Sequence, residues 1–151
     1  MNKVHVMTAL MLLAIAHLEA AKPKSAKKEK VTSGKIFNKN IYDLAHENTY
    51  FRKELVTGEH SQVVIMSIPV GGEIGMERHH VDQTLVFVEG EGQAIINDEI
   101  SDVSEDHLVF VPAGAEHNFK NTGDTELKLF TIYAPPQHKP GTVEKVKGKS
   151  Y

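Results

Sequence analysis

The sequence predicts an all-β domain, either a sandwich or a barrel of short strands. Between Tyr50 and Ala134, β-branched and aromatic residues gather in short runs. Gly, Pro and small polar residues separate these runs at close spacing, and no helical period of useful length occurs between them. Many short strands joined by Gly/Pro turns are typical of β-sandwiches and β-barrels.

Length and composition are those of a single globular domain. The 151 residues include 40% hydrophobic and 25% charged residues, as expected for a soluble protein. The chain contains neither cysteine nor tryptophan. The lack of cysteine excludes disulfides, zinc-finger chemistry and thiol nucleophiles.

The charge distribution is uneven. The formal net charge is -3, but residues 36–135 hold 6 Lys/Arg against 17 Asp/Glu, a net of -11. An acidic body argues against a nucleic-acid partner, whose phosphates require a basic surface. It is compatible with cation binding, and equally with a solvated acidic surface that keeps the protein soluble.

Residues 1–21 have the pattern of a secretory signal peptide. Lys3 precedes an apolar run over residues 4–16, and Ala14–Ala16 offers a small-x-small cleavage site, with a cut after Ala20 as an alternative. The run is shorter than the ~20 residues of a membrane span. We therefore expect export to the periplasm or secretion, with no stable membrane span after cleavage. The alternatives are an uncleaved anchor and an ordinary helix.

Two basic segments flank the predicted domain, which covers residues 36–136. Residues 22–35 begin with KPKSAKKEK, have no apolar face there, and are expected to form a short disordered linker. Residues 137–151 contain four lysines and little apolar content, which predicts a flexible basic tail.

Within the domain, residues 36–47 suit a short helix or a strand that leads into the barrel. The segments that follow share β-branched or aromatic content and are bounded by turn residues. They are residues 49–56, 62–68, 74–80, 83–89, 93–97, a short strand ending at 103, 108–111, 116–121 and 126–134.

Side chains that suit a metal lie in the stretch GGEIGMERHHVDQTLVFVEG, residues 71–90. Glu77, His79 and Gln83 are an even number of residues apart, so they share a face if the stretch is strand, tight bend, strand. A carboxylate, an imidazole and an amide oxygen together suit a divalent metal. His117, in VPAGAEHNF, is a fourth candidate, with a hydrogen-bonded interior histidine as its alternative. His80 should face outward unless the strand register is shifted.

The spacing of these residues follows a known motif. Five residues separate Gly71 from Glu77-x-His79. Three residues then separate His79 from Gln83, and six separate Gln83 from Gly90. This resembles the first cupin motif, which has a His in place of Glu77 and a Glu in place of Gln83.

A second motif follows at the spacing of the same family. Asp106 occupies a position that is usually glycine, and Pro112, Gly114, His117 and Asn121 all match. The chain from about residue 48 to residue 142 therefore resembles a small single-domain cupin of the mannose-6-phosphate-isomerase-like type.

The resemblance implies a double-stranded β-helix, the jelly-roll or cupin barrel, often dimeric and with one metal inside. By position, the metal ligands would be Glu77, His79, Gln83 and His117. Such nitrogen and oxygen donors favour Mn, Fe, Ni, Co or Zn over Ca or Mg. Gln83 is either a direct ligand or a residue that orients a ligand or a bound water.

Three functions are compatible with such a site. The first is a metal-dependent lyase, isomerase or dioxygenase acting on a small oxygenated molecule, sugar-like or acid-like, with Glu77 as the catalytic base if it leaves the metal. The second is a non-catalytic exported module that binds a small molecule or the metal, with an apolar lining from Leu85, Phe87, Phe110 and Phe119. The third is a metal-free structural barrel whose four polar side chains are hydrogen-bonded to one another.

Residues 83–89 also predict a homodimer. Leu85 and Phe87 share a face with Gln83, yet the opposite face, with Val86 and Val88, is largely apolar too. A strand that is apolar on both faces is buried on both. In so small a barrel, the second covering surface is expected to be another subunit.

Overall fold

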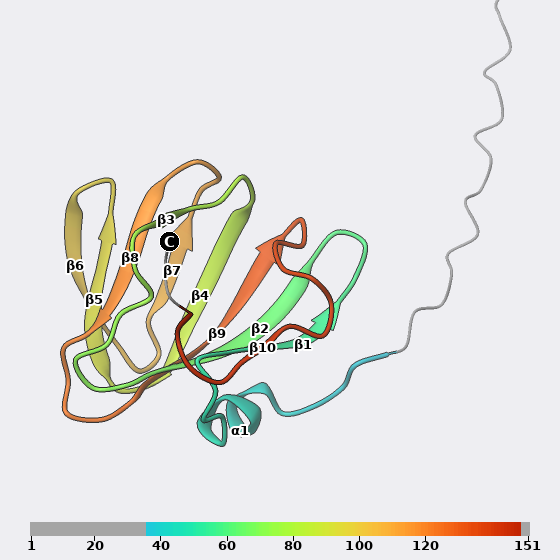
Figure 1. Ribbon diagram of the computed structural model, residues 1–151, viewed down its shortest axis with the longest axis horizontal. Helices are drawn as coiled ribbons and strands as arrows, with labels where there is room; N and C mark the ends of the chain where they lie inside the picture. The colour runs from blue at the N-terminus through green and yellow to red at the C-terminus, as the bar shows by residue number, and fades with distance from the viewer. Residues whose placement is uncertain (1–35, 149–151) are drawn as a thin grey trace, which may run out of the picture. The chain divides into compact units, whose positions relative to one another are not determined.

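Two antiparallel β-sheets form the barrel. The computed structural model describes residues 36–148, so the predicted signal peptide and the whole of the predicted linker lie outside the described residues. One sheet has six strands in the order β10-β1-β2-β9-β4-β7, and the other has four in the order β3-β8-β5-β6. Figure 1 shows the two sheets side by side. The predicted all-β jelly-roll architecture is confirmed.

Every strand pairs with its neighbours in antiparallel fashion. The six-stranded sheet consists of β10 (Val143–Glu144), β1 (Arg52–Thr57), β2 (Gln62–Ile68), β9 (Leu127–Ala134), β4 (Asp82–Glu89) and β7 (Leu108–Val111). The four-stranded sheet consists of β3 (Glu77–Arg78), β8 (Glu116–Asn121), β5 (Glu91–Ile96) and β6 (Glu99–Ser104).

Strands β2, β7 and β8 coincide with the predicted ranges, whereas the strand predicted over residues 74–80 is only two residues long. Gly75 has φ +97°, a conformation outside the strand region, and its N–H donates to Asn118 Oδ1 at 2.8 Å. The pairing with β8 is therefore interrupted at this glycine: Glu73 forms only an isolated bridge with Lys120 before it, and β3 begins after it, at Glu77.

A helix, α1 (Ile41–His46), leads into the barrel. Asn40 caps it, because its side-chain oxygen accepts from Tyr42 N at 3.1 Å. Ala45 packs with Ile65 and Val88 on the outer face of the six-stranded sheet. Part of the apolar outer face of β4 is thus covered by the chain's own helix. Within residues 36–148, no helix has the length and hydrophobicity of a membrane span.

The main core lies between the two sheets. Leu85 and Phe87 of β4 are fully buried in it, as the strand alternation predicts. Phe87 meets Phe119 of the opposite sheet with ring centroids 5.8 Å apart. The prediction that Phe110 lines the interior is wrong, because its side chain is 54% exposed. In β7 the partly buried Val109 and the buried Val111 alternate with Phe110, which therefore lies on the outer face.

The segment after β9 differs from the flexible tail that its composition predicts, over the part the structure describes. Residues 143–144 form β10, which pairs with Arg52 and Lys53 of β1. Phe51 N also donates to Lys145 O at 3.3 Å. Composition gave no indication of this pairing, because the anchoring partners lie on strands about 90 residues earlier in the chain.

Candidate metal centre

The antiparallel pairing of β3 with β8 brings Glu77 directly opposite His117. His79 follows immediately after β3, and its carbonyl accepts from Gly114 N at 2.7 Å, which ties the two motif segments together. His79 and His117 are buried, whereas His80 is exposed. The unshifted strand register expected for these residues is therefore the one that the fold adopts.

Glu77, His79 and His117 form a cluster that could hold a metal ion. One ligand atom from each residue lies within 4.8 Å of the others. Glu77 Oε1 is 3.3 Å from His79 Nε2 and 4.0 Å from His117 Nε2. Two donors on one metal, each at a bond length of about 2.1 Å, stand roughly 3 to 3.5 Å apart, so this arrangement is close to that of a bound site.

The buried donor atoms of the site lack hydrogen-bond partners among residues 36–148. They are His79 Nε2, His117 Nε2 and Gln83 Oε1. A buried polar atom without a partner is costly, and native proteins rarely leave one without a reason. These are the atoms with which such residues bind metals, so the side chains fit a metal. In a metal-free barrel, Glu77 and His79 could satisfy each other at 3.3 Å, but His117 Nε2 and Gln83 Oε1 would have no partner within residues 36–148.

The hydrogen bond made by His117 prepares its ring for coordination. Its Nδ1 lies 3.0 Å from the carbonyl oxygen of Ala115, which can only accept, so Nδ1 carries the proton. Nε2 then keeps its lone pair, as a metal ligand requires. Burial lowers the pKa of His117, with a smaller contribution from the charge of His79, and this favours the neutral form.

Glu77 supplies the negative charge of the cluster. Burial alone would raise its pKa, but the contact with His79 and the charges of His79, Arg52 and His117 outweigh this and lower it. Arg52 Nη2 is 3.8 Å from Glu77 Oε2. The carboxylate is therefore ionised at neutral pH, and its side chain is 26% exposed, so it is within reach of solvent.

Gln83 lies on the inner face of β4, opposite Tyr133 of β9. Its Nε2 donates to Tyr133 Oη at 3.1 Å, and its Oε1 has no hydrogen-bond partner in the part of the chain that the structure describes. The Tyr133 ring packs edge to face against His79, with centroids 5.6 Å apart. Burial raises the pKa of Tyr133, so the phenol stays protonated. Gln83 thus belongs to the same polar cluster as His79.

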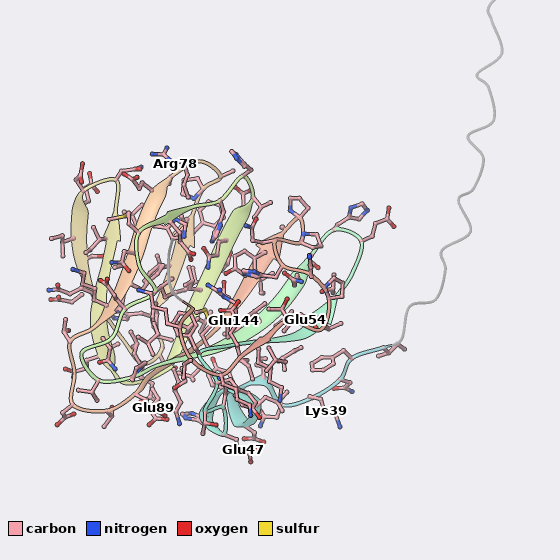
Figure 2. All side chains as sticks on the ribbon, in the orientation of Figure 1. Lys39, Glu47, Glu54, Arg78, Glu89 and Glu144 are labelled. Atoms are coloured by element: carbon pink, nitrogen blue, oxygen red, sulfur yellow. The ribbon has the colours of Figure 1, made fainter. Side chains whose placement is uncertain are left out.

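Two residues beside the cluster were not indicated by the sequence motifs. Arg52 is one of them, and its Nη1 also binds both carboxylate oxygens of Glu144, at 3.2 and 3.0 Å. Figure 2 labels Glu144. The other is His138, whose ring centroid is 5.0 Å from that of Tyr133 and 6.5 Å from that of His79. Burial lowers the pKa of His138 to about 4. Neither residue belongs to a motif, and only the path of the C-terminal segment brings His138 here.

Comparison with known proteins agrees with this fold. The cupin domain family matches residues 64–133. The chain is 43% identical over 120 residues to the uncharacterized protein YrkC of Bacillus subtilis, covering 75% of this chain and 64% of YrkC. It is 30% identical over 115 residues to the uncharacterized protein L612 of Acanthamoeba polyphaga mimivirus, covering 72% of this chain and 71% of L612.

Among solved structures, BH2720 of Bacillus halodurans is similar with a TM-score of 0.74 and 43% identity. The match covers 77% of this chain and 93% of BH2720. The sequence match, the two-sheet barrel and the Glu/His/His cluster agree with one another, and the chain belongs to the cupin family.

Proposed function

We propose that this cupin holds one divalent transition metal and acts on a small oxygenated molecule, sugar-like or acid-like, as a lyase, isomerase or dioxygenase. Glu77, His79 and His117 are the proposed ligands, with Gln83 Oε1 as a fourth donor. The observation that carries the proposal is the set of buried donor atoms without partners. When bound, Mn, Fe, Ni, Co or Zn would polarise an oxygen of the substrate.

The protein's own residues have distinct roles in this proposal. Glu77 is ionised and partly exposed, so once it leaves the metal it can accept a proton from the substrate as a general base. Tyr133 holds the Gln83 amide with its oxygen free. Phe119 lies 6.1 Å from the His117 ring, centroid to centroid, and supplies an apolar wall next to the ligands.

Metal content tests the proposal. The full-length chain, expressed without a chelating tag, should contain about one Mn, Fe, Ni, Co or Zn per protein by mass spectrometry. The double variant Glu77→Ala/His117→Ala should contain none, because it loses two donors of the three-residue cluster. His80→Ala, a change at the exposed neighbouring histidine, should keep the metal. If the parent takes up no metal after reloading with each ion, the catalytic proposal fails and a binding or structural barrel is left.

A non-catalytic binding module is a second candidate. It is favoured by the burial of His79 and His117, and by residues 137–148, which run along the edge of the barrel next to the site. A capture site should retain its metal or small molecule through purification, whereas a catalytic site exchanges its ligand freely.

We further propose export of the protein, on the signal-like pattern of residues 1–21.

We also propose a homodimer through the outer face of the β4–β7 edge. The strand register places Val86 beside Leu108 and Thr84 beside Phe110. Leu108 and Phe110 are mostly exposed, at 63% and 54%. Exposed apolar residues gathered on one sheet face suit a protein interface.

The double variant Leu108→Lys/Phe110→Lys should convert the dimer to monomer. The two lysine charges of each subunit would lose their water in the interface and would lie against the lysines of the other subunit. Analytical ultracentrifugation at micromolar concentration measures this. Ile100→Lys, at an equally exposed position in the other sheet, should leave the dimer intact. A monomeric parent would refute the proposed interface.

A further inference from the structure

A single buried side chain fixes the backbone at His138. Gln62 of β2 is fully buried, and its Oε1 accepts from His138 N at 2.8 Å and from Gln137 N at 3.3 Å. Its Nε2 donates to His138 O at 2.8 Å and to Thr57 Oγ1 at 2.8 Å. One side-chain amide therefore binds both the N–H and the carbonyl of His138, and this fixes the position of its Cα and Cβ atoms.

The chain beyond His138 is fixed to strand β1 as well. Glu54 Oε2 accepts from Gly141 N at 2.9 Å, and Glu54 N donates to Thr142 O at 2.9 Å. Glu54, labelled in Figure 2, also accepts from Thr57, at Oε1. The Gln62 and Glu54 contacts form one connected polar network, so residues 137–142 follow a defined path.

This path places the His138 ring next to the candidate metal centre. The ring packs against Tyr133 and lies 6.5 Å from His79, centroid to centroid, and its Nε2 is buried without a partner in the described part of the chain. An unpaired buried imidazole nitrogen destabilises a fold, so its retention requires a reason. His138 is not in the cluster of ligand atoms within 4.8 Å of one another, so its ring stands outside the ligands themselves.

We propose that His138 is a ligand-binding residue of this site, whose Nε2–H donates a hydrogen bond to a small anionic molecule bound at the metal, and that Gln62 positions it. The inference rests on the proposed metal function and adds the class of molecule and the residue that selects it. Arg52 offers a second donor beside the cluster, because its Nε is buried without a partner within residues 36–148 while its Nη2 lies 3.8 Å from Glu77 Oε2. Glu144 and Glu77 are the negative groups facing Arg52, and they hold its position.

The test uses the full-length chain loaded with Co²⁺, whose visible absorption reports the metal and its ligands. Azide is the probe, because it is a small anion that binds at an open metal position and accepts a hydrogen bond at its far end. In His138→Ala, the Co²⁺ content should equal that of the parent, while the azide Kd rises about tenfold from the loss of one hydrogen bond. Gln62→Leu should weaken azide binding in the same direction, whereas Gln137→Ala, at the exposed neighbour of His138, should not.

Each contrary outcome has a separate meaning. If the parent binds no Co²⁺, the proposed metal function fails and this inference fails with it. If the parent binds Co²⁺ but the azide Kd is unchanged in His138→Ala, or no azide binds, the metal function stands and the role of His138 is refuted. If His138→Ala loses Co²⁺, His138 serves the metal itself rather than the bound anion, which also overturns the proposal.

Discussion

Removing the metal should lower the free energy of unfolding by about 4 kcal/mol, when compared with protein in free metal a thousandfold above the Kd. The physical reason is that the ligands are assembled only in the folded state. His79 and His117 are brought together by the pairing of β3 with β8, with ring centroids 5.0 Å apart. Metal binding also relieves the cost of their unpartnered buried nitrogens. Urea unfolding in chelator and in excess divalent ion measures the difference.

The control for this experiment is the same pair of measurements on two histidine variants. His117→Ala should be less stable in both conditions, because the fully buried imidazole leaves a cavity, and the difference between chelator and metal should vanish. His80→Ala should keep the whole difference, since its side chain is exposed. An undiminished difference in His117→Ala would place the metal somewhere else on the chain.

The Phe87→Ala variant should lose about 3 to 5 kcal/mol of folding free energy, the range seen when a buried phenylalanine is truncated. Phe87 is fully buried between the sheets and contacts Phe119, which is also fully buried. The cavity cannot collapse easily, because strands of both sheets would have to move together to fill it. Urea unfolding of the chelator-treated protein measures this loss without the contribution of metal.

Ile100→Ala is the matched control, because Ile100 is 64% exposed on β6. Its truncation should change the free energy of unfolding by no more than about 0.5 kcal/mol. A loss below about 1.5 kcal/mol for Phe87→Ala would contradict a tightly packed contact between the sheets at this point.

Local patterns in the sequence were sufficient for most of the strands. Residues 62–68, 108–111 and 116–121 form strands with the predicted bounds, since each run ends at a Pro, Gly or polar turn that cannot continue the ladder. Asp106 stands where the second motif has a glycine, and it has φ +67°, a conformation that glycine adopts readily. The motif position therefore predicted the backbone conformation although the residue type differs. The strand predicted over residues 74–80 is shorter in the structure, because a tertiary hydrogen bond from Gly75 N to Asn118 Oδ1 sets the backbone there.

The face on which an isolated apolar residue lies was harder to predict than the strand itself. Phe110 was expected inside, but the alternation of β7 places Val109 and Val111 toward the core instead. In a four-residue strand, one residue of register decides which face is buried. Similarly, the sequence predicted that another subunit covers the whole outer face of β4. In the structure, α1 of the same chain covers Val88 on that face.

By itself, the sequence predicted the all-β architecture and the candidate cluster of Glu77, His79 and His117, because alternation along strands and motif spacing are local properties of the chain. Only the tertiary structure decided that Arg52, Tyr133 and His138 gather around them. These three are brought in by hydrogen bonds and strand pairings between segments far apart in the chain, and no local pattern encodes such contacts. The C-terminal segment has its position for the same reason: Gln62 and Glu54 bind its backbone, which every residue possesses, so its composition did not encode this path.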